Sequence, residues 1–127
     1  MQEEASSRPT VVVVDDDLAL RSSLKFALEL EGFSVRTYAD ASALLDDGLP
    51  AAGCLVIDQK LPGMSGFELL RHLRVRQVSL PIILITTHPT RALLAQAAMA
   101  GVRVIEKPLL TNALTDGIRE AMLGGKS

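Results

Sequence analysis

Acidic side chains follow two apolar segments of this chain. Asp15, Asp16 and Asp17 come directly after a run of valines, and Asp58 follows a second apolar run that ends at Ile57. Carboxylates that cluster repel one another unless a cation lies between them. Oxygen ligands suit a hard ion such as Mg²⁺, which keeps several waters and bridges to phosphate oxygens. These aspartates are therefore candidate ligands of a divalent cation.

A hydroxyl group and an ammonium group follow two further apolar runs. Thr86 stands at the end of one, before Thr87 and His88, and Lys107 comes after the last. A phosphoryl group on Asp58 would meet the cation on one side, with Thr86 and Lys107 on the other. Such an arrangement supplies the positioning and charge neutralisation on which phosphoryl transfer depends.

Each of these residues also has a simpler interpretation. An aspartate after a buried strand is often only the N-cap of a helix, which explains Asp17 equally well. His88 is also readily explained as an exposed loop histidine. The combination is more specific than its parts, because each chemical group follows a different apolar run in one repeating order.

The apolar runs themselves predict strands. They are short and rich in valine, isoleucine and leucine, which is typical of strands buried on both faces of a parallel sheet. Between them, apolar residues recur at helical spacing behind capping residues. Strands are predicted at 10–14, 33–38, 54–57, 81–85 and 102–105, and helices between Asp17 and Gly32, at 41–47, 65–76 and 89–100, and from the cap Thr111 to Gly124.

Strict alternation of strands and helices predicts an α/β fold with a parallel sheet, right-handed crossovers and helices on both faces. In such sheets ligands bind at the carboxyl ends of the strands, where all the candidate residues stand. The 127 residues fit one domain. We expect a flexible N-terminal arm at 1–9, the domain at 10–123, and a linker or tail at 124–127.

Composition excludes several other classes of protein. A net charge of −2 argues against a nucleic-acid platform, and its acidic groups are concentrated in residues 1–64. Cys54 is the single cysteine, so neither a disulfide framework nor zinc-ligand spacing is present. The apolar runs are far shorter than the roughly 18 residues of a membrane span, and residues 1–10 lack a signal-peptide pattern. These features predict a cytoplasmic protein that contacts no membrane.

Four motifs resemble the receiver domain of bacterial two-component response regulators, in a FixJ-like form. They are Val-Val-Asp-Asp-Asp at 13–17, Val-Ile-Asp-Gln-Lys-Leu-Pro-Gly-Met-Ser-Gly at 56–66, Ile-Thr-Thr-His at 85–88 and Glu-Lys-Pro at 106–108. The resemblance covers about residues 10–123. It implies a flavodoxin-like (CheY-like) three-layer sandwich, with strand order 2-1-3-4-5 and five helices.

The resemblance also implies a reaction. Asp58 would attack the phosphohistidine of a sensor histidine kinase and become an acyl phosphate. Asp16 and Asp58 would bind Mg²⁺ directly, with the backbone carbonyl of Lys60, and Asp15 would act through water. Thr86 and Lys107 would bind the phosphoryl oxygens, and the Lys107–Pro108 bond would be cis.

Four positions depart from the family pattern or tune it. Val104 stands where the family usually has an aromatic ring that rotates on activation, and valine has a stiff χ1 and no ring. Thr87 replaces a smaller residue beside the phosphate pocket. Lys60 and His88 occupy positions that tune the lifetime of the acyl phosphate.

These departures leave an alternative open: a degenerate receiver that acts as a protein-interaction module without phosphorylation. A phosphatase that works through an aspartyl phosphate is disfavoured, because Lys60 stands where its second aspartate would be.

By the same resemblance, an output surface comprises the helix at 89–100, the strand at 102–105 and the last helix. Phosphorylated receivers often dimerise through it. Receivers of this kind usually precede a DNA-binding domain, so an effector that regulates transcription would lie beyond Ser127.

Overall fold

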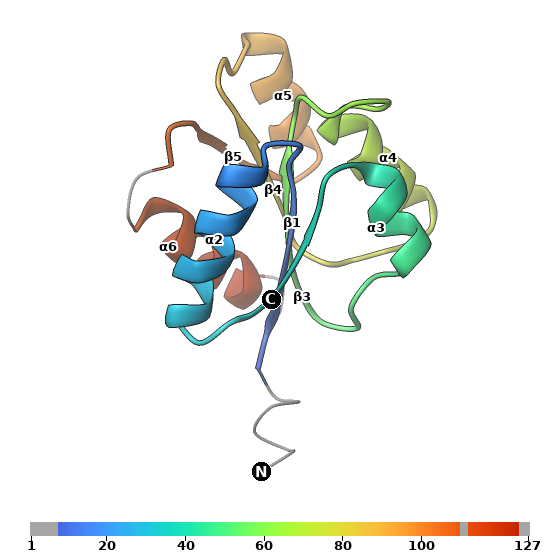
Figure 1. Ribbon diagram of the computed structural model, residues 1–127. Coiled ribbons are helices and arrows are strands. Elements are labelled where there is room, and N and C mark those ends of the chain that lie inside the picture. Colours follow the sequence, from blue (N-terminus) through green and yellow to red (C-terminus); the bar gives the residue numbers. More distant parts are fainter. Residues whose placement is uncertain (1–7, 110–111, 125–127) are drawn as a thin grey trace.

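The computed structural model describes residues 8–109 and 112–124, and within these ranges five strands alternate with five helices (Figure 1). The strands are β1 (Thr10–Val14), β2 (Ser34–Tyr38), β3 (Gly53–Asp58), β4 (Ile82–Thr86) and β5 (Arg103–Glu106). The helices are α2 (Leu18–Leu30), α3 (Ala41–Asp47), α4 (Gly66–Val75), α5 (Arg91–Met99) and α6 (Ala113–Gly124). The predicted cap Thr111 lies outside the described residues, as does most of the predicted arm and tail.

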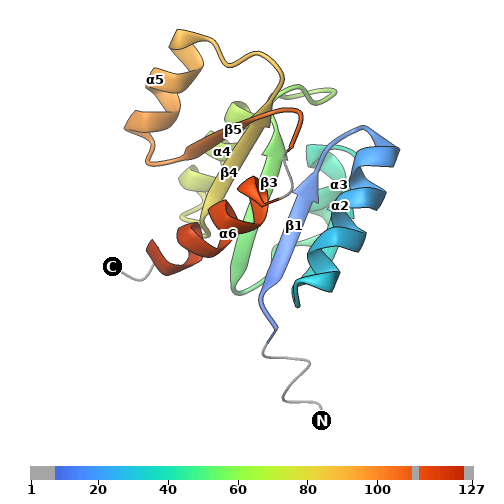
Figure 2. The ribbon, with the colours of Figure 1, turned by 90° about the vertical axis from the view of Figure 1, so that its left-hand side faces the viewer.

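All five strands run parallel in the order β2-β1-β3-β4-β5, which confirms the predicted topology. Figure 2 shows β1, β3, β4 and β5 side by side. β1 and β3 are neighbours, with Val14 opposite Ile57. The residues that follow these two strands therefore emerge side by side. β4 pairs with β3 on one side and with β5 on the other, so the four strands that precede the candidate site residues are adjacent.

Helices cover both faces of the sheet and create two separate hydrophobic cores. Successive side chains of a strand point to opposite faces. Val12 and Val14 accordingly face one core, which α3, α4 and α5 cover, whereas Val11 and Val13 face the other, which α2 and α6 cover (Figures 1 and 2). Both cores are almost wholly aliphatic, as the low aromatic content predicts. They fix the strands from both sides and so fix the edge that carries the polar residues.

Side-chain caps begin four of the helices immediately after the strand-end loops. An N-cap side chain satisfies a backbone N–H group that has no partner within the helix. The caps are Asp17 for α2, Asp40 for α3, Ser65 for α4 and Thr90 for α5. The cap Thr90 places the start of α5 at Arg91, two residues later than predicted.

Over residues 8–109 and 112–124, none of the helices combines the length and apolarity that crossing a membrane requires.

Candidate functional site

Three carboxylates meet at the carboxyl edge of the sheet. Asp15 and Asp58 are buried, with 0% and 5% of their surface exposed, while Asp16 is exposed. One oxygen of each lies within 4.8 Å of the others. A hard divalent cation could bind between them, with Asp16 on the solvent side.

The loop after β1 holds Asp15 rigidly. Its backbone N–H donates to the carbonyl of Tyr38 at 3.0 Å, which extends the pairing of β1 with β2 by one residue. Its Oδ1 accepts the N–H of Asp17 at 2.9 Å. Its own carbonyl accepts Nη1 of Arg21 at 2.8 Å, from one turn into α2. These bonds leave the second carboxylate oxygen of Asp15 to face the site.

The loop after β3 begins directly after Asp58, the last residue of the strand. Gln59 donates its N–H to the carbonyl of Ile85 at 2.8 Å and accepts the N–H of Gly66 at 2.9 Å. The N–H of Lys60 points to Oδ1 of Asp58 at 3.4 Å. Gly66 packs so closely that a Cβ atom there would lie 2.6 Å from the carbonyl oxygen of Asp58. The start of α4 is thus in direct contact with the strand end that carries Asp58.

Lys107 reaches the acidic cluster from the end of β5. Its Nζ lies 3.0 Å from Oδ2 of Asp15 and 3.3 Å from Oδ2 of Asp58. Its backbone N–H donates to the carbonyl of Thr86 at 2.8 Å, and its peptide bond to Pro108 is cis. The ammonium group therefore bridges the two buried carboxylates.

The pKa values of Asp58 and Lys107 depend on burial and on the charges beside them. Burial, and then the charge of Asp15, raise the pKa of Asp58, although Lys107 partly opposes this. Burial alone would lower the pKa of Lys107, but its hydrogen bond to Asp15 and the charges of Asp58 and Asp15 outweigh it and raise that pKa. Three carboxylates lie beside one ammonium group here, so this edge carries more negative charge than Lys107 neutralises. The donor set and its charge therefore fit a bound divalent cation.

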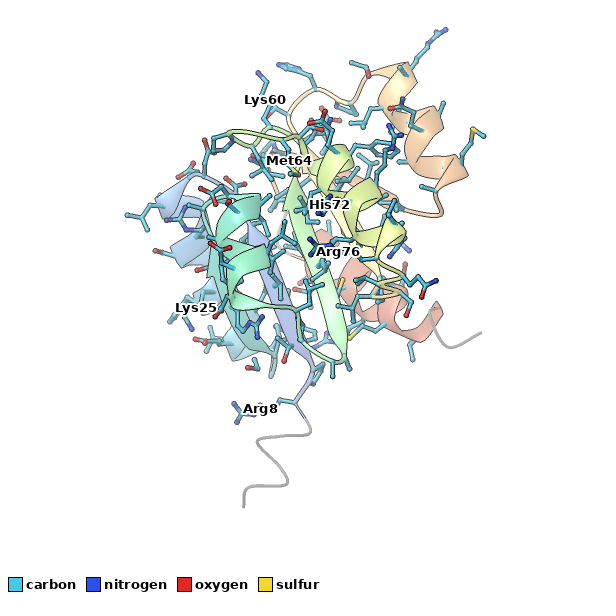
Figure 3. All side chains as sticks on the ribbon, turned by 90° about the vertical axis from the view of Figure 1, so that its right-hand side faces the viewer. Arg8, Lys25, Lys60, Met64, His72 and Arg76 are labelled. Carbon is cyan, nitrogen blue, oxygen red and sulfur yellow. The ribbon has the colours of Figure 1, made fainter. Side chains whose placement is uncertain are left out.

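The remaining predicted residues surround this cluster at different depths. Thr86 is buried at the end of β4, and Thr87 and His88 after it are exposed. Lys60 is exposed, and Figure 3 shows it at the same end of the molecule as Met64. Val104 lies within β5, partly buried against the core beneath α3, α4 and α5. The ammonium group of Lys107 thus joins Asp15 and Asp58, and Asp16 completes the carboxylate cluster. Thr86 is joined to Lys107 through its backbone.

Sequence reasoning missed two residues that support the site, Arg21 and Gln59. Arg21 appears in the sequence as an ordinary polar residue on the outer face of a helix, and Gln59 as an ordinary loop residue. Their contacts depend on how loops and helices pack, which local patterns do not encode.

The sequence of this chain matches a known family of domains and several curated proteins. A family model for the response regulator receiver domain matches residues 11–119. The transcriptional regulatory protein FixJ of Bradyrhizobium diazoefficiens is 40% identical over 124 residues, which cover 92% of this chain and 60% of that protein.

Two solved structures of response regulators superpose closely on this chain. The response regulator StyR has a TM-score of 0.86 at 38% identity, over 94% of this chain and 62% of that one. Full-length FixJ from B. japonicum has a TM-score of 0.84 at 37% identity, over 93% of this chain and 59% of that one. The chain therefore spans about three-fifths of the length of these proteins.

Proposed function

Because this chain belongs to the response regulator receiver domain family, we propose that Asp58 accepts a phosphoryl group from the phosphohistidine of a sensor histidine kinase. The proposal is carried by one observation: the buried carboxylate of Asp58 lies beside two other acidic groups and 3.3 Å from the ammonium of Lys107. A receiver is a signalling domain. Its phosphorylation would serve to change a surface that a partner protein contacts.

In the proposed reaction an oxygen of Asp58 attacks phosphorus, and the new P–O bond forms as the P–N bond to the histidine ring breaks. Negative charge then spreads over the phosphoryl oxygens. The ammonium group of Lys107 is close enough to Asp58 to pair with one of them. The hydroxyl of Thr86 is the second proposed partner, and both groups are held at strand ends before the reaction begins.

We assign Asp16, Asp58 and the backbone carbonyl of Lys60 as direct ligands of Mg²⁺, with Asp15 acting through water. Bound Mg²⁺ would neutralise charge on the phosphoryl oxygens. The support is that three carboxylate oxygens lie within 4.8 Å of one another with one ammonium group beside them.

The same site would lose the phosphoryl group by hydrolysis, so the domain would set the lifetime of its own signal. Lys60, Thr87 and His88 are exposed close to the strand ends that carry the site. We propose that they control the approach of the hydrolytic water and of the phosphodonor.

The phospho-acceptor assignment predicts a mass change that depends on one residue. Incubation with acetyl phosphate and Mg²⁺ should add the mass of one phosphoryl group to the native chain and none to Asp58→Asn. Intact-protein mass spectrometry measures both. Asp46→Asn is the matched control, because Asp46 is an exposed aspartate in the last turn of α3, at the end of that helix remote from the strand ends. A native chain that gains no mass from acetyl phosphate or from a phosphorylated histidine kinase would contradict the assignment.

We propose that the output surface comprises α5, β5 and α6, and that two phosphorylated copies pair through it. Two apolar side chains of α5 are exposed there, Leu94 at 45% and Met99 at 91%. Val104 in β5 has no ring to rotate, so on this proposal the surface responds through backbone shifts around Thr86. The relatives are transcriptional regulators of greater length, and an effector domain that regulates transcription is the proposed receiver of the signal.

The dimer surface predicts that Met99→Glu prevents phosphorylation-dependent pairing. Pairing would bury the new carboxylate in an apolar contact, and its loss of hydration would cost about 2 kcal/mol or more. Sedimentation velocity with and without acetyl phosphate measures the change. Phe26→Glu is the control, because Phe26 is another largely exposed apolar residue, on α2, across the sheet from α5. Loss of pairing in both variants, or in neither, would argue against this surface.

Val104 and Thr87 also favour a second candidate function, a receiver that signals by contact without phosphorylation. Such a protein would not need a working cation site. Its response to Mg²⁺ therefore separates the two functions.

A further inference from the structure

Gln59 makes hydrogen bonds that cannot be predicted from its position in the sequence. Besides its two backbone hydrogen bonds, to Ile85 and from Gly66, its side-chain Oε1 accepts the N–H of Phe67 at 2.9 Å. The residue next to Asp58 is therefore bonded both to β4 and, twice, to the start of α4.

The first turn of α4 depends on Gln59 for its capping. The first N–H groups of a helix have no partner within it. Ser65 caps the N–H of Glu68 through its hydroxyl. The N–H groups of Gly66 and Phe67 instead bond to the carbonyl and the side chain of Gln59. Of the first three N–H groups of α4, two therefore bond to Gln59. The loop at 60–65 starts next to Gln59, and its far end is bonded back to the same residue.

We propose that Gln59 is a positioning residue for the metal-binding loop. Lys60 is the first residue of the loop that Gln59 closes, and its N–H already faces Oδ1 of Asp58 at 3.4 Å. Without the side-chain bond the N–H of Phe67 loses its partner, and the first turn of α4 loosens from the strand end. The carbonyl of Lys60 then samples several orientations, and a cation bound to it loses a fixed ligand. This inference rests on the proposed Mg²⁺ site.

Three substitutions at Gln59 separate the hydrogen bond from the bulk of the side chain. Gln59→Met keeps the length and removes the acceptor, Gln59→Asn keeps the amide but is one methylene shorter, and Gln59→Glu keeps both length and acceptor. Amide hydrogen exchange at Phe67, measured by NMR without Mg²⁺, reports the bond itself. Calorimetric titration with Mg²⁺ reports its effect on the site. Gln96→Met, at an exposed position on α5, is the matched control.

We expect Gln59→Met and Gln59→Asn to lose protection at the Phe67 amide and to weaken Mg²⁺ binding about fivefold, the effect of one typical hydrogen bond. Gln59→Glu should keep the protection, and Gln96→Met should change neither quantity. Should Gln59→Met fail to fold, the smaller change Gln59→Asn carries the comparison. Unchanged protection at Phe67, or lost protection with unchanged Mg²⁺ affinity, would overturn the inference. A native chain that binds no Mg²⁺ would instead overturn the metal assignment on which it rests.

Discussion

At the scale of single residues, the site is a place where charge is costly. Asp58 is buried, lies close to the charge of Asp15, and has a raised pKa despite the nearby Lys107. An acid whose pKa is raised by folding binds its proton more tightly in the native state than in the unfolded state. Its ionisation therefore reduces the free energy of unfolding. The group on which the proposed function depends makes the domain less stable.

This cost predicts how stability depends on pH. In the absence of divalent cations, the contribution of Asp58 to stability should fall as pH rises above the ordinary aspartate pKa of about 3.9. Asp58→Asn removes the titrating group, so it should unfold at a higher temperature at pH 7, by on the order of 3 °C.

Thermal melts of the two proteins in EDTA, from pH 4 to pH 7, measure this. The stability difference between them should grow with pH, because the native chain must ionise a buried group and the variant need not. A difference that stays constant, or shrinks as pH rises, would show that the ion pair with Lys107 outweighs burial.

At the scale of elements, the sequence predicted the strands and the sheet more accurately than the contacts between loops. Valine and isoleucine runs indicate buried strands because little else suits them, and the alternation of elements then leaves few topologies. The four strand ends and the buried positions of Asp15, Asp58 and Thr86 follow from that. Side-chain bonds across a loop, such as those of Arg21 and Gln59, depend on tertiary packing and leave no periodic signal.

One element boundary carries measurable strain. Gln77, just after α4, has φ of 65°, the only positive φ of a non-glycine residue in the described part of the chain. The left-handed conformation costs an ordinary L-residue about 1 kcal/mol, and glycine adopts it freely. Its backbone N–H bond to the carbonyl of Arg74 does not need a side chain.

Gln77→Gly should therefore stabilise the domain by about 0.5–1 kcal/mol. Urea unfolding measures the change as a higher midpoint at an unchanged slope. Gln96→Gly is the counterpart, because Gln96 lies inside α5, where glycine costs about 1 kcal/mol. The two substitutions should move the midpoint in opposite directions, and a lower midpoint for Gln77→Gly would show that its side chain outweighs the strain.

At the scale of the whole molecule, the two cores enclose the sheet and leave the acidic cluster at one end. A cation that binds only the native state stabilises it by mass action, by about 2.7 kcal/mol at a hundredfold excess over its Kd. Thermal melts should therefore shift upward with increasing Mg²⁺ concentration and return when EDTA is added.

Asp16→Asn should abolish most of this shift, because it removes a proposed direct ligand of Mg²⁺. Asp16 is the exposed member of the carboxylate cluster. Asp46→Asn is its matched control on the far end of α3. A melting temperature that does not change with Mg²⁺ concentration would fit the second candidate function, the receiver that signals by contact alone.

The contact between Gly66 and the carbonyl of Asp58 limits which variants of this protein can arise. A Cβ atom at position 66 would lie 2.6 Å from backbone oxygen, and neither the strand end nor the helix can give way without moving Asp58. Gly63 has open space around it and is restricted only by its positive φ. In a library randomised at both positions and selected for folding, position 66 should return glycine alone, while position 63 should also return asparagine. The junction between strand and helix in this chain is thus closed to substitution, and sequence change must enter through the residues around it.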